Sequence, residues 1–167
     1  RDWSSDVCSS DLKAKGLGVV RDVGLVFNNE IPAGGTKTKS FLARWASATV
    51  GATWSKAGWG ISVDGYVQKD YVTKRPVVAS SVIIQFVEQY DSKYGDRFGG
   101  KTPLARTIGS GTAIILRNGQ RFAATWSRPT AESGTVYAVN GETFPLPTGQ
   151  VWVILVNRAK PSSVSFK

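Results

Sequence analysis

The sequence of residues 112–127 is TAIILRNGQRFAATWS, and it predicts a β-hairpin. Two runs with strand-like composition flank the pair Asn118-Gly119. Asn and Gly tolerate positive φ, so this pair fits a type I′ turn, whose twist matches that of two antiparallel strands. A second pair, Asn140-Gly141, separates residues 135–139 from residues 142–144 and predicts another hairpin.

Further strand signals surround these hairpins. Residues 81–88, SVIIQFVE, are almost continuously apolar, which predicts a strand buried on both faces. Residues 150–157, QVWVILVN, predict a final buried strand after the turn formed by Pro145, Pro147 and Gly149. Two further runs alternate between apolar and other residues. One places Phe41, Ala43 and Trp45 on the same face of a strand, and the other places Trp59, Ile61 and Val63 on the same face of a second strand.

Strands at short intervals with turn residues between them predict a mainly β fold. We expect an antiparallel sheet with hairpins, in a sandwich or a partly open barrel. Residues 13–22 and 69–79 leave a β-rich α+β fold open, although neither carries a clean amphipathic stripe. Residues 90–102 are polar and Gly-rich and predict an exposed loop.

The chain divides into four expected parts. Residues 1–12, RDWSSDVCSSDL, back-translate in frame to a string that resembles a common sequencing-library adapter. We interpret them as an artefact and exclude them from the fold; a genuine N-terminal arm is the alternative. Residues 13–30 are expected to be a remnant or linker of a missing N-terminal domain. Residues 31–158 are the expected β-rich domain, and residues 159–167 an expected tail.

Composition restricts the chemistry. The chain has no His, and its one cysteine, Cys8, lies in the adapter-like segment. The remainder therefore excludes Ser-His-Asp and Cys-His nucleophile systems and zinc sites of the Cys/His type. Residues 1–12 carry one Arg and three Asp, so the formal net charge of +9 becomes +11 for the rest. Such a charge favours acidic partners, or simply accompanies solubility.

Two groups near the hairpins are candidate binding residues. Trp126 and Arg128 share a strand face, and an Arg beside an aromatic ring can hold a carboxylate or phosphate. The alternative is an internal clasp with Trp126 in the core. Glu88, Asp91 and Asp96 can serve acid–base chemistry or bind a hard cation, or can form a solvated loop.

Aromatic residues alternate with basic ones in the first half of the β-rich domain. This pattern fits stacking on single-stranded nucleic acid or on sugars, or else the inward face of a sheet. The residues concerned are Trp45, Trp54, Trp59 and Tyr66, among Arg44, Lys56 and Lys69.

Five motifs follow one another in a distinctive order. They are Ile83-Ile84-Gln85-Phe86, Gly109-Ser110-Gly111, Trp126-Ser127-Arg128, Asn140-Gly141 with Leu146, and Gly149-Gln150-Val151-Trp152. This order resembles the C-terminal region of the YerB-like lipoproteins, a bacterial family of unknown function. The upstream Trp-rich segment 41–65 is similar in a looser way. The sequence departs from the family at Ser80-Ser81, where an Asn is usual, and no role is carried over to that position.

The resemblance implies a location outside the membrane at the cell envelope, and our first hypothesis for this domain is a non-enzymatic binding or assembly module. The full-length protein would be anchored to the membrane through a lipobox ahead of residue 13 and would have an N-terminal domain as a partner. The basic charge suits anionic envelope polymers or lipid headgroups as ligands, and we expect no catalytic residue, metal or cofactor. The candidate binding residues are Gln85, Glu88, Asp91, Trp126, Arg128, Trp45 and Trp59.

Two alternatives remain open at this point. One is a nucleic-acid-binding domain with an OB-like basic and aromatic sheet. The other is an envelope enzyme based on carboxylates and Arg. The enzyme requires at least two of five residues to converge in one pocket, namely Asp64, Glu88, Asp91, Asp96 and Arg128.

Overall fold

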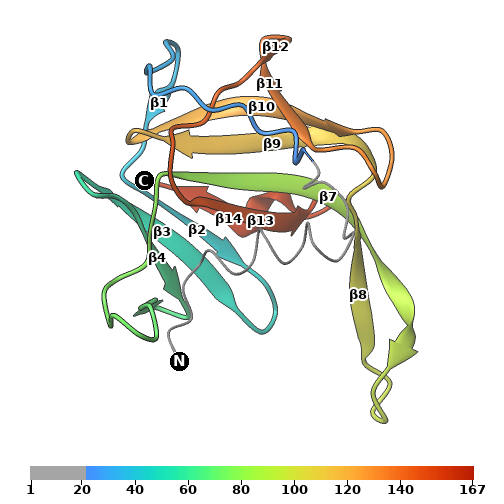
Figure 1. Cartoon of the computed structure of the whole chain (residues 1–167). Coiled ribbons are helices and arrows are strands. Elements are labelled where there is room, and N and C mark those ends of the chain that lie inside the picture. Colours follow the sequence, from blue (N-terminus) through green and yellow to red (C-terminus); the bar gives the residue numbers. More distant parts are fainter. Residues whose placement is uncertain (1–21) are drawn as a thin grey trace, which may run out of the picture.

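The computed structural model describes residues 22–167, which form two packed β-sheets (Figure 1). The larger sheet has the order β12 (Glu142–Thr143), β11 (Val136–Val139), β10 (Gln120–Arg128), β9 (Gly109–Arg117), β7 (Ser81–Gly95), β13 (Val151–Asn157), with β1 (Thr36–Lys37) on β10 and β8 (Lys101–Arg106) on β7. The smaller sheet has the order β14 (Val164–Phe166), β2 (Ser40–Arg44), β3 (Thr49–Ser55), β4 (Gly58–Val63), β5 (Tyr66–Val67), with β6 (Val78–Ala79) on β4.

The core between the two sheets makes the fold a sandwich. Side chains from both sheets form one buried cluster, which includes Phe41, Trp59 and Ile61 from the smaller sheet and Val82, Ile84 and Leu116 from the larger one. The sheets do not close into a barrel. Of the two predicted architectures, the structure therefore confirms the sandwich. Within residues 22–167 the only helical element is a 3₁₀ turn, Pro161–Ser163, so no helix there is long enough to cross a membrane.

A second buried cluster lies on the other face of the larger sheet. It includes Ile83, Ile115, Phe122, Trp126 and Leu146. Successive side chains of a strand point to opposite faces, so β7 supplies Val82 and Ile84 to the first cluster and Ile83 and Val87 to the second. Burial on both faces explains the continuous apolar run, as the sequence predicted.

Both predicted Asn-Gly hairpins are confirmed. Asn118 and Gly119 have φ of 51° and 70°, and they join β9 to β10 in register. Asn140 and Gly141 have φ of 52° and 85° and join β11 to β12. Positive φ at both central residues is the type I′ geometry that this residue pair favours.

Strand β13 is the one strand of the larger sheet that pairs in parallel. It lies beside β7 with Val151 opposite Ser81 and Asn157 opposite Val87. The prediction of a buried strand here is only partly right, since Val153 is 48% exposed. β13 is an edge strand of the larger sheet, so fewer neighbouring side chains cover it than cover a strand inside the sheet.

One sequence prediction of local structure was wrong, and another was only partly right. Residues 69–79 form no helix: Asp70 accepts hydrogen bonds from Thr73 in a turn, and β6 follows. Most of residues 90–102 are exposed as predicted, but only residues 96–100 form a turn, because β7 continues to Gly95 and pairs with β8. These two strands form a ribbon that projects from the body (Figure 1), and we call residues 88–106 the arm.

The segments that flank the expected β-rich domain pack against it where they are described. Val23 and Val26 accept backbone hydrogen bonds from Thr135 and Leu146 at 2.9 and 2.8 Å. The expected tail contributes β14, which pairs with β2 and adds Phe166 to the first cluster. The adapter-like segment and almost all of the possible helix at 13–22 lie outside the described residues.

Candidate functional site

Trp126 lies in the core, and its indole spans two strands. Its Nε1 donates a hydrogen bond of 2.9 Å to the carbonyl oxygen of Phe86 on β7. Gly111 on β9 lies opposite Trp126, and a Cβ there would stand 2.7 Å from that nitrogen. The glycine therefore gives the ring room to cross β9, which accounts for part of the Gly-Ser-Gly motif.

Arg128 clasps the loop that follows its own strand. Its Nε donates to the carbonyl oxygen of Ser133 at 3.0 Å and its Nη2 to that of Ala131 at 2.7 Å. A cavity of about 340 Å³ opens beside it, lined mainly by Asp22, Val23 and residues 131–135. The enzyme alternative needs at least two of its five candidate residues in one pocket, and of the five only Arg128 lines this cavity.

Gln85 forms a buried polar pair that the sequence did not reveal. The hydroxyl of Tyr137 donates to Gln85 Oε1 at 2.6 Å inside the second cluster. Burial raises the pKa of Tyr137 to about 12, from an ordinary value of 10.0, because the phenolate would be desolvated. The pair joins β7 to β11 within the second buried cluster.

Alkaline pH is expected to destabilise the domain through Tyr137. Between pH 10 and pH 12 the unfolded chain releases this proton and the folded chain keeps it, so the free energy of unfolding falls as pH rises. The fall is about 2–3 kcal/mol for a shift of this size. Urea unfolding at pH 8 to 12 measures it. Tyr137→Phe should remove this loss of unfolding free energy, whereas Tyr71→Phe, at an exposed site, should retain it. If both variants lost the same free energy between pH 10 and pH 12, Tyr137 would not be the group responsible.

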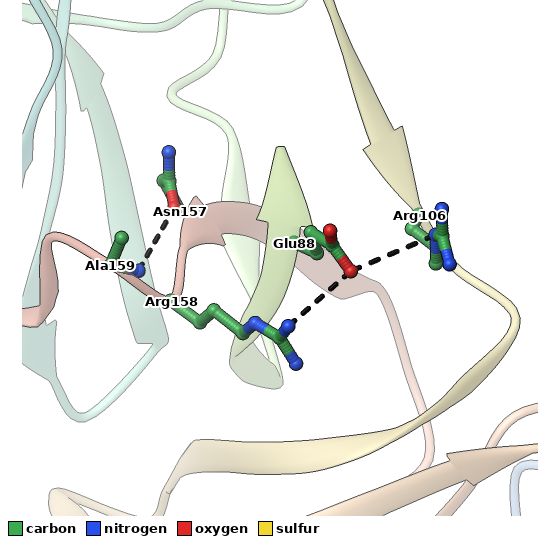
Figure 2. A network of polar contacts seen from close by, with 5 residues as sticks. All are labelled: Glu88, Arg106, Asn157, Arg158 and Ala159. Carbon is green, nitrogen blue, oxygen red and sulfur yellow. Dashed lines mark hydrogen bonds and ion pairs between the residues drawn. The ribbon is translucent and has the colours of Figure 1, made fainter. Parts of the chain in front are cut away.

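Glu88 lies at the base of the arm in a small ion network (Figure 2). Its Oε2 is 3.3 Å from Arg158 Nη2 and 3.7 Å from Arg106 Nε. The turn that carries Arg158 is fixed by a hydrogen bond from the Ala159 amide to Asn157 Oδ1. All three charged side chains are well exposed, so the pairs contribute at most about 1 kcal/mol.

The other candidate carboxylates lie apart from Glu88. Asp91 is exposed on the arm opposite Pro103, and Asp96 sits in the turn at the arm's tip. Asp64 accepts a hydrogen bond from the Thr49 amide at 2.7 Å on the smaller sheet. Among residues 22–167, no three His, Cys, Asp or Glu side chains gather in a way that would hold a metal ion.

The tryptophans of the smaller sheet point into the sandwich. Trp59 is fully buried, and the ring centroid of Trp54 lies 5.2 Å from its own. Trp45 packs against the same cluster. These three rings therefore belong to the inward face of the sheet, as one of the two interpretations expected. They do not form the exposed platform for stacking bases that the nucleic-acid alternative requires.

The outer face of the smaller sheet holds a feature that the sequence analysis missed. Leu42, Gly51 and Ser62 lie side by side on β2, β3 and β4, and the small residues leave a shallow cavity of about 250 Å³. We call it the outer groove. It is lined by Ser40, Phe41, Leu42, Arg44, Gly51, Ala52, Thr53, Ser62, Ser165 and Lys167.

The outer groove combines hydroxyl groups with positive charge. Four of its lining residues are Ser or Thr, and two are cations, Arg44 and Lys167. Neither cation has a carboxylate partner within the described part of the chain. Hydroxyls exchange hydrogen bonds with the hydroxyls of a polyol, and cations bind phosphate or carboxylate oxygens. The alternation of residues 40–45 indicated which side chains face outward. It did not indicate which residues of β3 and β4 lie beside them, because that depends on the register of the strands.

The fold and its surface features define a two-sheet β-sandwich domain that carries a projecting ribbon. A family model described as "Protein of unknown function (DUF3048) C-terminal domain" matches residues 42–153. The chain belongs to this family.

One solved structure is similar in fold, the crystal structure of the YerB protein from Bacillus subtilis. The TM-score is 0.70 at 16% sequence identity, with 98% of this chain and 54% of that chain covered. The chain thus spans about half the length of YerB. No curated protein matches the sequence.

Proposed function

We propose that this domain is a non-enzymatic binding module of a lipid-anchored, extracytoplasmic protein, and that its outer groove binds an anionic polyol-phosphate polymer of the cell envelope. The observation that carries the proposal is the outer groove itself, in which two cations and four hydroxyl side chains line one cavity. The envelope location rests on the resemblance of the sequence motifs to the YerB-like lipoproteins.

The placement of the two cations favours a polymer over a single phosphate. Lys167 exchanges backbone hydrogen bonds with Ser40, at one end of β2, and Arg44 is the last residue of that strand. At 3.3 Å per residue their backbone positions are about 13 Å apart. A chain with repeated phosphates reaches both cations while its polyol units meet the hydroxyls between them.

The overall charge supports a polyanionic ligand. Residues 1–21 hold four of the 21 Lys and Arg and three of the 12 Asp and Glu, which leaves 17 cations against nine carboxylates in the described part. Several of those carboxylates already accept hydrogen bonds from nearby amides, as Asp64 and Asp96 do. An excess of cations raises the local concentration of an anionic chain and its rate of association.

Binding to poly(glycerol phosphate) tests this proposal. We expect the chain to bind it at low salt and to release it as salt rises, because exposed charges are screened. Arg44→Gln should weaken binding about tenfold, equivalent to about 1.4 kcal/mol. Lys56→Gln is the matched control: it removes the same charge at an exposed site outside the groove.

Three outcomes would contradict the proposal. An absence of binding at low salt would exclude this ligand class. Equal losses in Arg44→Gln and Lys56→Gln would mean that net charge, and not the outer groove, attracts the polymer. Equal affinity for single-stranded DNA of the same charge would show that the polyol units are not recognised.

A further inference from the structure

The arm is a two-stranded ribbon that extends away from both sheets. β7 pairs with β9 only as far as Gln85 and with β13 only as far as Val87, so beyond Glu88 its partner is β8. From Glu88, β7 continues over seven residue steps to Gly95, a reach of up to roughly 23 Å for an extended strand, and Phe98 lies in the turn beyond it. The arm therefore presents its tip well clear of the sandwich (Figure 1).

The tip of the arm exposes apolar side chains. Phe98 is 82% exposed and Tyr94 is 65% exposed, and further back the cross-strand pair Tyr90 and Leu104 is also exposed. An isolated two-stranded hairpin is marginally stable in water, and a Phe at its end adds no packing to the fold. Exposed apolar residues gathered in this way mark an interaction site.

Four backbone amides of the turn at the tip are hydrogen-bonded within it. The carboxylate of Asp96 accepts hydrogen bonds from the amides of Phe98 and Gly100 at 2.8 and 2.9 Å. The amides of Asp96 and Gly99 also donate within the turn. Gly100 is needed here, because a Cβ on it would stand 2.7 Å from the Asp96 carboxylate. The tip can thus leave water without losing these hydrogen bonds.

Three cations surround the exposed rings. Lys93 lies over the ring of Tyr94 at 5.3 Å and Arg97 over that of Phe98 at 4.7 Å, and Lys101 begins the returning strand. Asp96 is the one carboxylate among residues 92–105, and it is engaged in the turn. The tip therefore combines exposed aromatic rings with the positive charge of the side chains beside them.

We propose that the tip of the arm inserts Phe98 and Tyr94 into the surface of an anionic lipid bilayer. A phenyl ring suits the hydrocarbon, a tyrosine suits the interface, and the cations lie at the level of anionic headgroups. The amides of Phe98, Gly99 and Gly100 are already hydrogen-bonded within the turn, which lowers the cost of moving them into a lipid environment. The inference is independent of the polymer proposed for the outer groove.

Co-sedimentation of the chain with vesicles tests the proposal. We expect binding to vesicles that contain phosphatidylglycerol and little binding to pure phosphatidylcholine. Phe98→Ser should lower the partition coefficient about tenfold, and Phe98→Leu should largely restore it. Tyr71→Ser is the matched control, since Tyr71 is an 86% exposed aromatic with Lys74 4.3 Å from its ring, on a different turn.

The outcomes separate this proposal from that of the outer groove. Unchanged vesicle binding in Phe98→Ser, or equal losses in Phe98→Ser and Tyr71→Ser, would overturn the arm's role. Wild-type chain that ignores anionic vesicles would also overturn it. Binding of poly(glycerol phosphate) should survive Phe98→Ser, so loss of one activity without the other shows which surface is responsible. Unfolding curves of each variant check that the fold is intact.

Discussion

Replacing Arg117 with Met is expected to lower the free energy of unfolding by about 3–5 kcal/mol. Arg117 is fully buried, and its guanidinium has no carboxylate partner in the described part of the chain. Instead it donates to the carbonyl oxygens of Pro145 at 2.6 Å, of Asn28 at 2.8 Å and of Glu30. Burial lowers the pKa of Arg117, yet an arginine remains protonated, so the charge depends on these carbonyls.

The Arg117→Met experiment isolates the guanidinium from the bulk of the side chain. Met keeps an unbranched apolar stem but provides no donor, so at least three carbonyl oxygens lose their partner. Urea unfolding measures the loss, and Arg121→Met, at a partly exposed site four residues away, should cost well under 1 kcal/mol. Similar losses in both variants would show that the carbonyl cluster does not need Arg117.

Replacing Trp59 with Ala is expected to cost a similar amount, about 3–5 kcal/mol, because it empties the centre of the sandwich. Trp59 is fully buried among residues of both sheets, and its ring packs against Trp54 at 5.2 Å between centroids. Thermal and urea unfolding measure the change. A loss below about 1 kcal/mol would mean that the sheets collapse onto the vacated volume.

Two Trp→Phe variants separate ring packing from hydrogen bonding. Within residues 22–167 the Nε1 of Trp59 meets no hydrogen-bond acceptor, whereas that of Trp126 donates to the carbonyl oxygen of Phe86. Trp59→Phe therefore removes an unsatisfied donor along with some packing, while Trp126→Phe leaves a carbonyl oxygen unpaired. We expect Trp126→Phe to be the more destabilising of the two, and the reverse order would contradict the assignment of these hydrogen bonds.

The parts of the fold that could be predicted are those that local chemistry specifies. The two Asn-Gly turns have positive φ, which Asn and Gly tolerate, so the turns could be predicted from residue type. The SVIIQFVE run has no polar face to expose, so a strand buried on both faces could be predicted as well. The parallel pairing of β13 and the contact of β14 with β2 join residues far apart in the chain, and no local pattern encodes them.

The arm was missed for a physical reason. Both faces of its outer part meet water, so residues 90–102 show none of the alternation that marks a half-buried strand. Among the candidate site residues, the shared face of Trp126 and Arg128 followed from spacing. The partners of Gln85 and the composition of the outer groove depend on which strands become neighbours, and one sequence does not contain that information.

The parallel strand β13 has a consequence for how the domain forms. β7 is paired on both sides over its first half, yet the neighbour on one side, β13, is synthesised only after β8 to β12. A nascent chain that ends at β12 leaves that edge of β7 without a partner, and a bare apolar edge recruits strands from other molecules. Pairings between distant segments also close slowly. We therefore expect the docking of β13 to be the late step at which folding competes with aggregation.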